Sequence, residues 1–195
     1  MGRERGKPMA RFAGAMPLVQ GQARTRRFFD WLAPRYDVVN AVIFRPEWRR
    51  MVREAILPGR VLDVGVGTGY STRGFRDAVG LDISSGMLAR AEYDGSLVRA
   101  DAMRAPFRAA SFFTIVCAGS FYYLPDPVEA LRGFWRVLET HGRVVLLSPE
   151  AWFLRPLVRV YTKSEYQEMA GAAGFVLERH ETLRGVACLV LFRKE

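Results

Sequence analysis

Hydrophobic positions along the chain follow two different spacings, and the change between them divides the sequence. Between residues 28 and 56, apolar residues recur every three or four positions, which predicts two short helices, the second starting after Pro46. From residue 60 onward, short apolar runs alternate with helical stripes. The predicted strands lie at 61–64, 79–83, 97–100, 112–118, 144–148, 175–182 and 185–192.

Local signals mark where the intervening helices begin and end. A helix is expected directly after the glycine-rich turn at 65–69, and Ser84 can cap a second one that contains Met87 and Ala91. Thr162 and Glu165 form a predicted capping box for the last helix, which should end at Gly174. Asp126 followed by proline predicts another helix start, with an inner face of Val128, Leu131, Phe134, Trp135 and Leu138.

Alternating strands and helices predict an α/β fold, with a sheet that is parallel through the fifth strand. The last two strands are joined by a short turn at 183–185, so one of them must run against the sheet. The expected organisation is a basic N-terminal arm at 1–20, N-terminal helices covering the active site at 21–58, and a ligand-binding domain at 59–195.

Composition narrows the class of protein. Half of the 195 residues are hydrophobic and 25% are charged, which is typical of a globular domain and excludes a disordered or fibrous chain. The apolar runs are too short to cross a bilayer, and two cysteines make no disulfide framework. We therefore expect a cytoplasmic protein with reduced thiols.

The net charge of +9 is the unusual quantity, and 26 of the 29 basic residues are arginine. An anionic partner, such as RNA or an anionic membrane surface, would explain this excess. A genome that favours arginine codons would explain it equally well, because the arginines are spread along the chain. Both interpretations stay open.

The candidate ligand site begins where the first predicted strand ends. Gly65, Gly67 and Gly69 follow it at alternate positions, and glycine there lets the backbone approach a ligand. The spacing differs from the G-x-G-x-x-G of dinucleotide sites. Asp82 ends the second strand, where it can accept both hydroxyls of a ribose, and Asp101 ends the third, where it can accept from an adenine amine.

These segments together resemble class I S-adenosylmethionine-dependent methyltransferases. The similarity covers about residues 60–150 and rests on 63–69, 81–84, 101–102 and 112–124 in that order. It implies a Rossmann-like, seven-stranded, mostly parallel sheet with one antiparallel strand and helices on both faces. It also implies S-adenosyl-L-methionine as cofactor and S-adenosyl-L-homocysteine as product. The implied cofactor contacts are Asp63, Gly65, Gly67, Gly69, Asp82, Ile83, Asp101, Ala102, Cys117 and Ala118.

A narrower similarity lies upstream. Residues 29–40, followed by Trp48 and Arg49, are similar to the opening of menaquinone and ubiquinone C-methyltransferases, in which a tyrosine like Tyr36 closes the cofactor site. Such openings also occur across many small-molecule methyltransferases, so the broader group stays open. The chain departs from the quinone enzymes at 149–161, where a short segment replaces a longer cap and would leave the pocket more open.

Few residues are candidates for acid–base chemistry near a transferred methyl group. Tyr122, Tyr123 and Glu150 follow the fourth and fifth strands, on the expected ligand side of the sheet. The tyrosines can equally serve as apolar walls of the acceptor pocket. His141 and His180 are expected to be structural or solvent-facing, and no His, Cys and carboxylate spacing predicts a metal site.

Three functions remain in competition. The first is methyl transfer to a small aromatic or lipid-like acceptor, supported by the apolar loop at 121–124 and by apolar residues 12, 16 and 18, which could add a lid. The second is RNA methylation, supported by the positive charge. The third is a non-catalytic binding role for a methyltransferase fold, against which the intact glycine and aspartate pattern argues.

Overall fold

The computed structural model describes residues 22–195, so the predicted arm at 1–20 and its apolar lid residues lie outside the described residues. Seven strands form one sheet, in the spatial order β3-β2-β1-β4-β5-β7-β6. Their bounds are β1 Val61–Val64, β2 Ala78–Asp82, β3 Ser96–Arg99, β4 Phe112–Ala118, β5 Leu138–Pro149, β6 Phe175–Leu183 and β7 Ala187–Lys194.

The sheet has the direction pattern predicted from the sequence. β1 pairs in parallel with β2 and β4, β2 pairs in parallel with β3, and β4 pairs in parallel with β5. β7 runs antiparallel to both β5 and β6. The seven-stranded, mostly parallel fold with one reversed strand is therefore confirmed.

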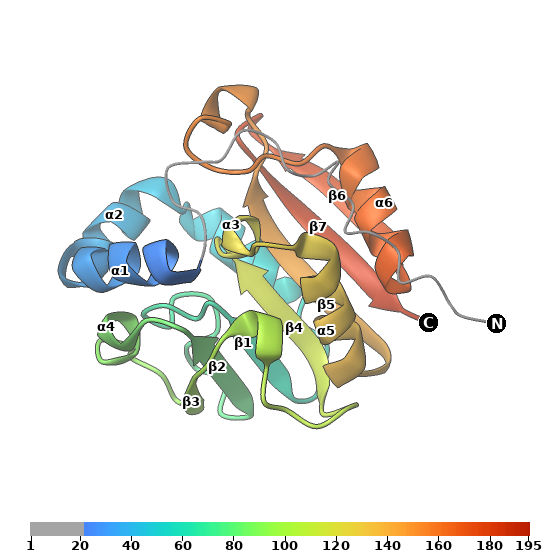
Figure 1. Cartoon of the computed structure of the whole chain (residues 1–195), viewed down its shortest axis with the longest axis horizontal. Helices are drawn as coiled ribbons and strands as arrows, with labels where there is room; N and C mark the ends of the chain where they lie inside the picture. The colour runs from blue at the N-terminus through green and yellow to red at the C-terminus, as the bar shows by residue number, and fades with distance from the viewer. Residues whose placement is uncertain (1–21) are drawn as a thin grey trace.

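Helices cover both faces of this sheet (Figure 1). α5 and α6 pack together on one face, over a core that includes Leu62, Ile115 and Leu146. α3 covers the other face through Trp48 and Val52. The helices are α1 Gln22–Leu32, α2 Tyr36–Ile43, α3 Pro46–Glu54, α4 Ser85–Leu88, α5 Pro127–Val137 and α6 Lys163–Ala173, with 3-10 turns at Ala33–Arg35, Ala102–Arg104, Phe121–Tyr123 and Trp152–Leu154.

The capping signals act as predicted. The Asp126 carboxylate accepts from the first amides of α5, and Thr162 forms the complete capping box of α6 with Glu165. α6 ends at Gly174, whose φ of 86° is the left-handed conformation that glycine adopts without strain. Ser84 accepts from the amide of Met87. Each of these side chains satisfies amides that a helix start leaves unpaired.

The predicted helix after the glycine turn is wrong. Residues 65–77 connect β1 to β2 through a series of turns. Gly69 and Gly74 have φ of 91° and 93°, outside the helical region. Arg53 also donates to the carbonyls of Ser71 and Arg73, which fixes this segment from outside.

Three smaller expectations also fail. α4 ends at Leu88, short of Ala91. Trp135 is 41% exposed instead of facing inward, because its ring lies over the Lys194 ammonium, 3.9 Å from the centroid. β5 begins at Leu138, so His141 lies within the strand, at a φ of 62°.

Among the described residues, no helix is both long and apolar enough to cross a membrane.

Candidate functional site

The principal cavity lies at the carboxyl ends of four parallel strands. The cavity is lined by residues that follow these strands. They are Gly65 and Gly67 after β1, Asp82 and Ile83 at the end of β2, and residues 100–102 after β3. Gly119 and Ser120 complete it after β4. The strand order reverses between β1 and β4, which is where open α/β sheets bind their ligands.

The glycine turn brings bare backbone to the cavity. Gly65 and Gly67 have φ of 72° and 57°, a region that side chains rarely adopt. A Cβ on Gly65 would lie 2.4 Å from the Cβ of Ser120, whose hydroxyl donates to the carbonyl of Val64 over 2.6 Å. This packing ties the ends of β1 and β4 together and leaves no room for a side chain at Gly65.

The Asp82 carboxylate is held in place by two backbone amides. Its Oδ2 accepts from Gly67 and its Oδ1 from Ser84, both over 2.9 Å. Burial raises the pKa of the carboxyl, and these hydrogen bonds oppose that shift. A carboxylate has about four lone-pair positions. Asp82 can therefore accept ligand hydroxyls while keeping both backbone contacts.

Asp101 lies on the same wall, one strand further along. Its Oδ1 accepts from the amide of Met103 and caps the 3-10 turn that carries Ala102. The helix-cap alternative for this aspartate is thus present, and the residue also lines the cavity. Among the described residues that line this cavity, Asp82 and Asp101 are the carboxylates.

Aromatic rings from the N-terminal helices close the opposite side. Phe29 of α1 contacts Tyr36 and Tyr123 edge-on, with ring centroids 6.2 and 5.2 Å apart. Burial is the main cause that raises the pKa of Tyr36 far above its usual value, and nearby Tyr123 adds to the shift, so the phenol stays neutral. Asp37 accepts from the Thr68 hydroxyl over 2.6 Å, which anchors α2 to the glycine turn.

Four expected cofactor contacts lie behind the wall instead of on it. Asp63 is buried and accepts from Thr72 over 2.6 Å. Burial raises the pKa of this carboxyl to about 7, and the Thr72 hydrogen bond opposes the shift. A Cβ on Gly69 would meet the carbonyl of Glu92 at 2.7 Å. Cys117 and Ala118 pack into the core on opposite faces of the sheet.

Sequence reasoning named Cys117 and Ala118 at β4 but missed Gly119 and Ser120, the next two residues, which line the cavity. The signal was present: a small glycine–serine pair directly after a buried strand. Burial raises the pKa of Cys117 to about 12, so its thiol is no nucleophile here.

Tyr122 and Tyr123 face two different cavities. Tyr123 lines the principal one, whereas Tyr122 lines a second cavity of about 140 Å³. The two rings lie 4.5 Å apart, so the cavities are neighbours. The second cavity is lined by Phe44, Trp48, Tyr122, Leu147, Ser148, Pro149, Leu154, Val186 and Ala187.

Glu150 lies away from both cavities. Its Oε1 accepts from the Thr182 hydroxyl over 3.1 Å and lies 3.5 Å from the Nε2 of His180.

Burial raises the pKa of both Tyr122 and Tyr123, so neither phenol is a base near neutral pH. The structure therefore brings the tyrosines to the site as neutral walls and places Glu150 on the α6 side of the sheet.

Several arginines whose purpose the sequence left open bind backbone carbonyls. Arg53 holds the 65–77 turns, as described above. Arg136 donates to Ala105 and Phe107, and Arg143 pairs with Glu178 while donating to Ala55. Part of the arginine excess therefore serves the fold itself.

Comparison with known proteins agrees with this geometry. Residues 62–146 match a family model described as a methyltransferase domain. The chain is 36% identical over 148 residues to a demethylmenaquinone methyltransferase from Renibacterium salmoninarum, covering 69% of this chain and 62% of that protein. It is 33% identical over 164 residues to a demethylmenaquinone methyltransferase from Deinococcus radiodurans, covering 73% of this chain and 68% of that protein.

A solved structure shows the same fold. A SAM-dependent methyltransferase from Thermotoga maritima superposes with a TM-score of 0.75 at 17% identity, covering 87% of this chain and 99% of that one. The chain spans less than two thirds of the length of the Renibacterium protein. The sequence match to the Deinococcus protein, together with the glycine turn and the strand-end aspartates, identifies the family. The chain belongs to the S-adenosylmethionine-dependent methyltransferases of class I.

Proposed function

We propose that the protein transfers a methyl group from S-adenosylmethionine to a quinol-type acceptor that carries an apolar tail. The observation that carries this proposal is the pair of neighbouring cavities on either side of Tyr122 and Tyr123. One has the aspartates and the glycine turn that suit a nucleoside, and the other is apolar. The two demethylmenaquinone methyltransferases above support the acceptor class.

The residues of the principal cavity suit the cofactor. Asp82 would accept the ribose hydroxyls, Asp101 and Ala102 would contact the adenine, and Gly65 and Gly67 would approach the methionine part. When bound, the cofactor supplies a methyl group activated on a sulfonium centre. Phe29 and Tyr36 would exclude water from it, and aromatic faces attract such cations. Asp63 does not line the cavity and would support the cofactor site indirectly, by accepting from Thr72 and so holding the glycine turn in place.

The acceptor would meet the cofactor at Tyr123 and Gly119. A Cβ on Gly119 would lie 2.6 Å from the Cζ of Phe44, so the Phe44 ring packs directly against Gly119. Phe44 lines the apolar cavity and Gly119 lines the principal one, so the two cavities adjoin here. An apolar tail placed there would contribute a favourable binding free energy of about 25 cal/mol for each Å² of its apolar surface that is buried. The neutral phenols would orient a ring hydroxyl, and orientation with desolvation is the main contribution that the chain can supply.

The test is methyl transfer from radiolabelled S-adenosylmethionine in detergent micelles. Three acceptors are compared: a prenylated demethylnaphthoquinol, the same ring without its tail, and total RNA. We expect label in the prenylated quinol. Label in RNA alone, or in no acceptor despite measured cofactor binding, would contradict the proposal in favour of RNA methylation or a binding role.

A variant pair locates the tail. Leu154→Arg places a charge in the apolar cavity and should lower kcat/KM for the prenylated quinol about tenfold or more, while sparing the tail-less ring. Leu97→Arg, at a 38% exposed leucine on edge strand β3, is the matched control and should change neither. Equal loss for both acceptors in Leu154→Arg would place the tail elsewhere.

A further inference from the structure

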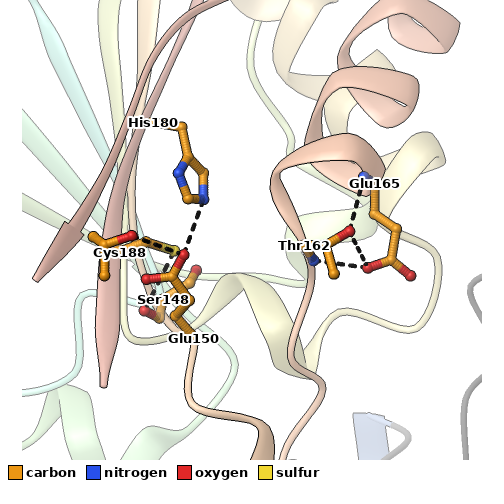
Figure 2. A network of polar contacts seen from close by, with 7 residues as sticks. Ser148, Glu150, Thr162, Glu165, His180 and Cys188 are labelled. Carbon is orange, nitrogen blue, oxygen red and sulfur yellow. Dashed lines mark hydrogen bonds and ion pairs between the residues drawn. The ribbon is translucent and has the colours of Figure 1, made fainter. Parts of the chain in front are cut away.

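A group of chemically reactive side chains lies outside both cavities, at the end of the sheet where β5, β7 and β6 adjoin. Ser148 of β5 and Thr182 of β6 both pair with Cys188 of β7, and His180 is two residues before Thr182. Side chains two residues apart on a strand share a face. Cys188 and His180 therefore project to the same side, where Figure 2 shows them around Glu150.

Two atoms of this group are buried without a hydrogen-bond partner. They are the Nε2 of His180 and the Oε2 of Glu150. The His180 side chain is only 6% exposed, and its Nε2 points at the Oε1 of Glu150 from 3.5 Å, beyond a good hydrogen bond. Leaving such a group unsatisfied costs about 1–3 kcal/mol. An ion held between them would remove that cost.

The spacing and chemistry of the group suit a metal ion. One ligand atom each from Glu150, His180 and Cys188 lie within 4.8 Å of one another. Tetrahedral zinc, with bonds of about 2.0–2.3 Å, places its ligands about 3.3–3.6 Å apart. The His180–Glu150 distance already has this value, and the sulfur needs to approach by about 1 Å. Calcium and magnesium favour oxygen ligands, so a thiol and an imidazole select against them.

We propose that Glu150, His180 and Cys188 bind one divalent ion of the zinc class, with water as the fourth ligand. Thr182, which donates to Glu150, is the residue that orients the carboxylate. The ion would join three strands at the sheet edge. It would also fix the start of the 151–161 segment, which carries Leu154 of the apolar cavity. The site is independent of the proposed acceptor.

Metal binding must release a proton. The metal ligand is the thiolate, so Cys188 must lose its proton when the ion binds. On binding, the metal–sulfur bond replaces the S–H bond and the proton leaves to solvent. Metal affinity should therefore rise with pH, by up to about tenfold per unit.

Cobalt(II) titration of the untagged full chain, under a phosphine reductant after chelator treatment, tests this site. We expect one equivalent to bind with a thiolate-to-cobalt charge-transfer band that zinc(II) abolishes. Cys188→Ser should remove the band, and Cys117→Ser, at the other fully buried cysteine, should keep it. His180→Gln should lower affinity at least about tenfold, and exposed His141→Gln should not.

Circular dichroism shows whether each variant folds, and Glu150→Gln replaces Cys188→Ser if that variant does not. The result that overturns the proposal is the absence of a stoichiometric thiolate band in the folded wild-type chain. A band that survives Cys188→Ser also overturns it. Either result would leave His180 and Glu150 as a plain buried contact.

A second observation, independent of the first, concerns the surface of the 151–161 segment. Trp152, Phe153 and Leu157 are 77%, 56% and 52% exposed. Three large apolar side chains in one short segment are unusual on a soluble surface. Exposed Arg155 lies among them, and residues 151–161 contain no acidic residue.

We infer that this loop docks on an anionic lipid bilayer. Tryptophan and phenylalanine favour the membrane interface, and each nearby arginine adds about 1 kcal/mol on an anionic leaflet. Leu154 of the same loop lines the apolar cavity, and Val186 beside it is 36% exposed. A lipid acceptor could therefore pass from the bilayer to the cavity. The passage of an acceptor rests on the proposed function, whereas the docking of the loop on a bilayer does not.

Vesicle co-sedimentation of the full chain tests docking with no acceptor present, so its outcome is separate from that of the activity test. We expect binding to vesicles of phosphatidylglycerol and phosphatidylcholine and about tenfold weaker binding to phosphatidylcholine alone. Trp152→Ser with Phe153→Ser should lower binding about tenfold or more. Trp31→Ser, at a 69% exposed tryptophan of α1, should not. Equal loss in both variants, or no vesicle binding by the wild type, overturns the inference.

Discussion

The two polar regions of this protein sit at the same end of one sheet but are built in opposite ways. At the end of β2, each Asp82 oxygen already accepts from a backbone amide. At the end of β5, the Nε2 of His180 and the Oε2 of Glu150 are buried without a hydrogen-bond partner. The first region is complete before a ligand arrives.

This difference indicates what each region can bind. A carboxylate fixed by amides presents its remaining lone pairs in a set direction, which suits the hydroxyls of an organic ligand. A carboxylate, an imidazole and a thiol that converge on one point suit a cation. The following variants separate the two cases.

Gly65→Val should produce the largest effect on cofactor binding. The new side chain would overlap Ser120 and adopt a φ of 72°, so the turn must shift. We expect cofactor affinity, measured by calorimetry, to fall at least about 100-fold, or about 2.7 kcal/mol. Gly185→Val, at a φ of 70° in open space, carries the same strain without the overlap and should keep full affinity. Equal affinities in the two variants would refute the steric argument.

Asp63 should make stability depend on pH. Its folded pKa of about 7 lies above the unfolded value, so the folded state holds the proton more tightly. Stability from this group is complete below about pH 4 and is lost as pH rises through 7, by up to about 1.4 kcal/mol per unit. Denaturant unfolding of Asp63→Asn and wild type at pH 5, 6, 7 and 8 measures it. Parallel profiles would show that Asp63 does not titrate in this range.

Asp82→Ala should weaken cofactor binding by about 2 kcal/mol, since ribose contacts and two amide partners are lost together. Asp94→Ala is the matched control. Its Oδ2 also accepts from a glycine amide, that of Gly74, over 2.9 Å, but it lies off the cavity. Calorimetry of the two variants separates ligand contact from loop support, and unchanged affinity in folded Asp82→Ala would remove Asp82 from the cofactor site.

The sequence predicted well the elements whose signals are local. Asp126, Thr162 and Gly174 mark helix ends through their own backbone geometry, and the structure confirms each. The reversed strand followed from one short turn. These features need only a few neighbouring residues, so periodicity and capping rules suffice to locate them.

Features decided by distant contacts were missed. The segment after Gly69 has the spacing of a helix start, but Arg53 from α3 holds its carbonyls and makes turns of it. Glu150, His180 and Cys188 come together through strand register alone, and their spacing in the chain gives no sign of it. β4 ends at Ala118, as predicted, but its last two residues pack into the core, and the cavity is lined by Gly119 and Ser120 beyond the strand end.

The smallest expected effect belongs to Thr182, beside Glu150. Thr182→Val removes the hydroxyl that donates to Glu150 but keeps the side-chain shape. Because the contact is exposed, unfolding free energy should fall by only about 0.5 kcal/mol. Cobalt(II) affinity should fall about tenfold, since the carboxylate is no longer oriented, and Thr182→Ser should restore it. If stability falls while cobalt affinity stays the same, Thr182 supports the sheet edge and does not orient a metal ligand.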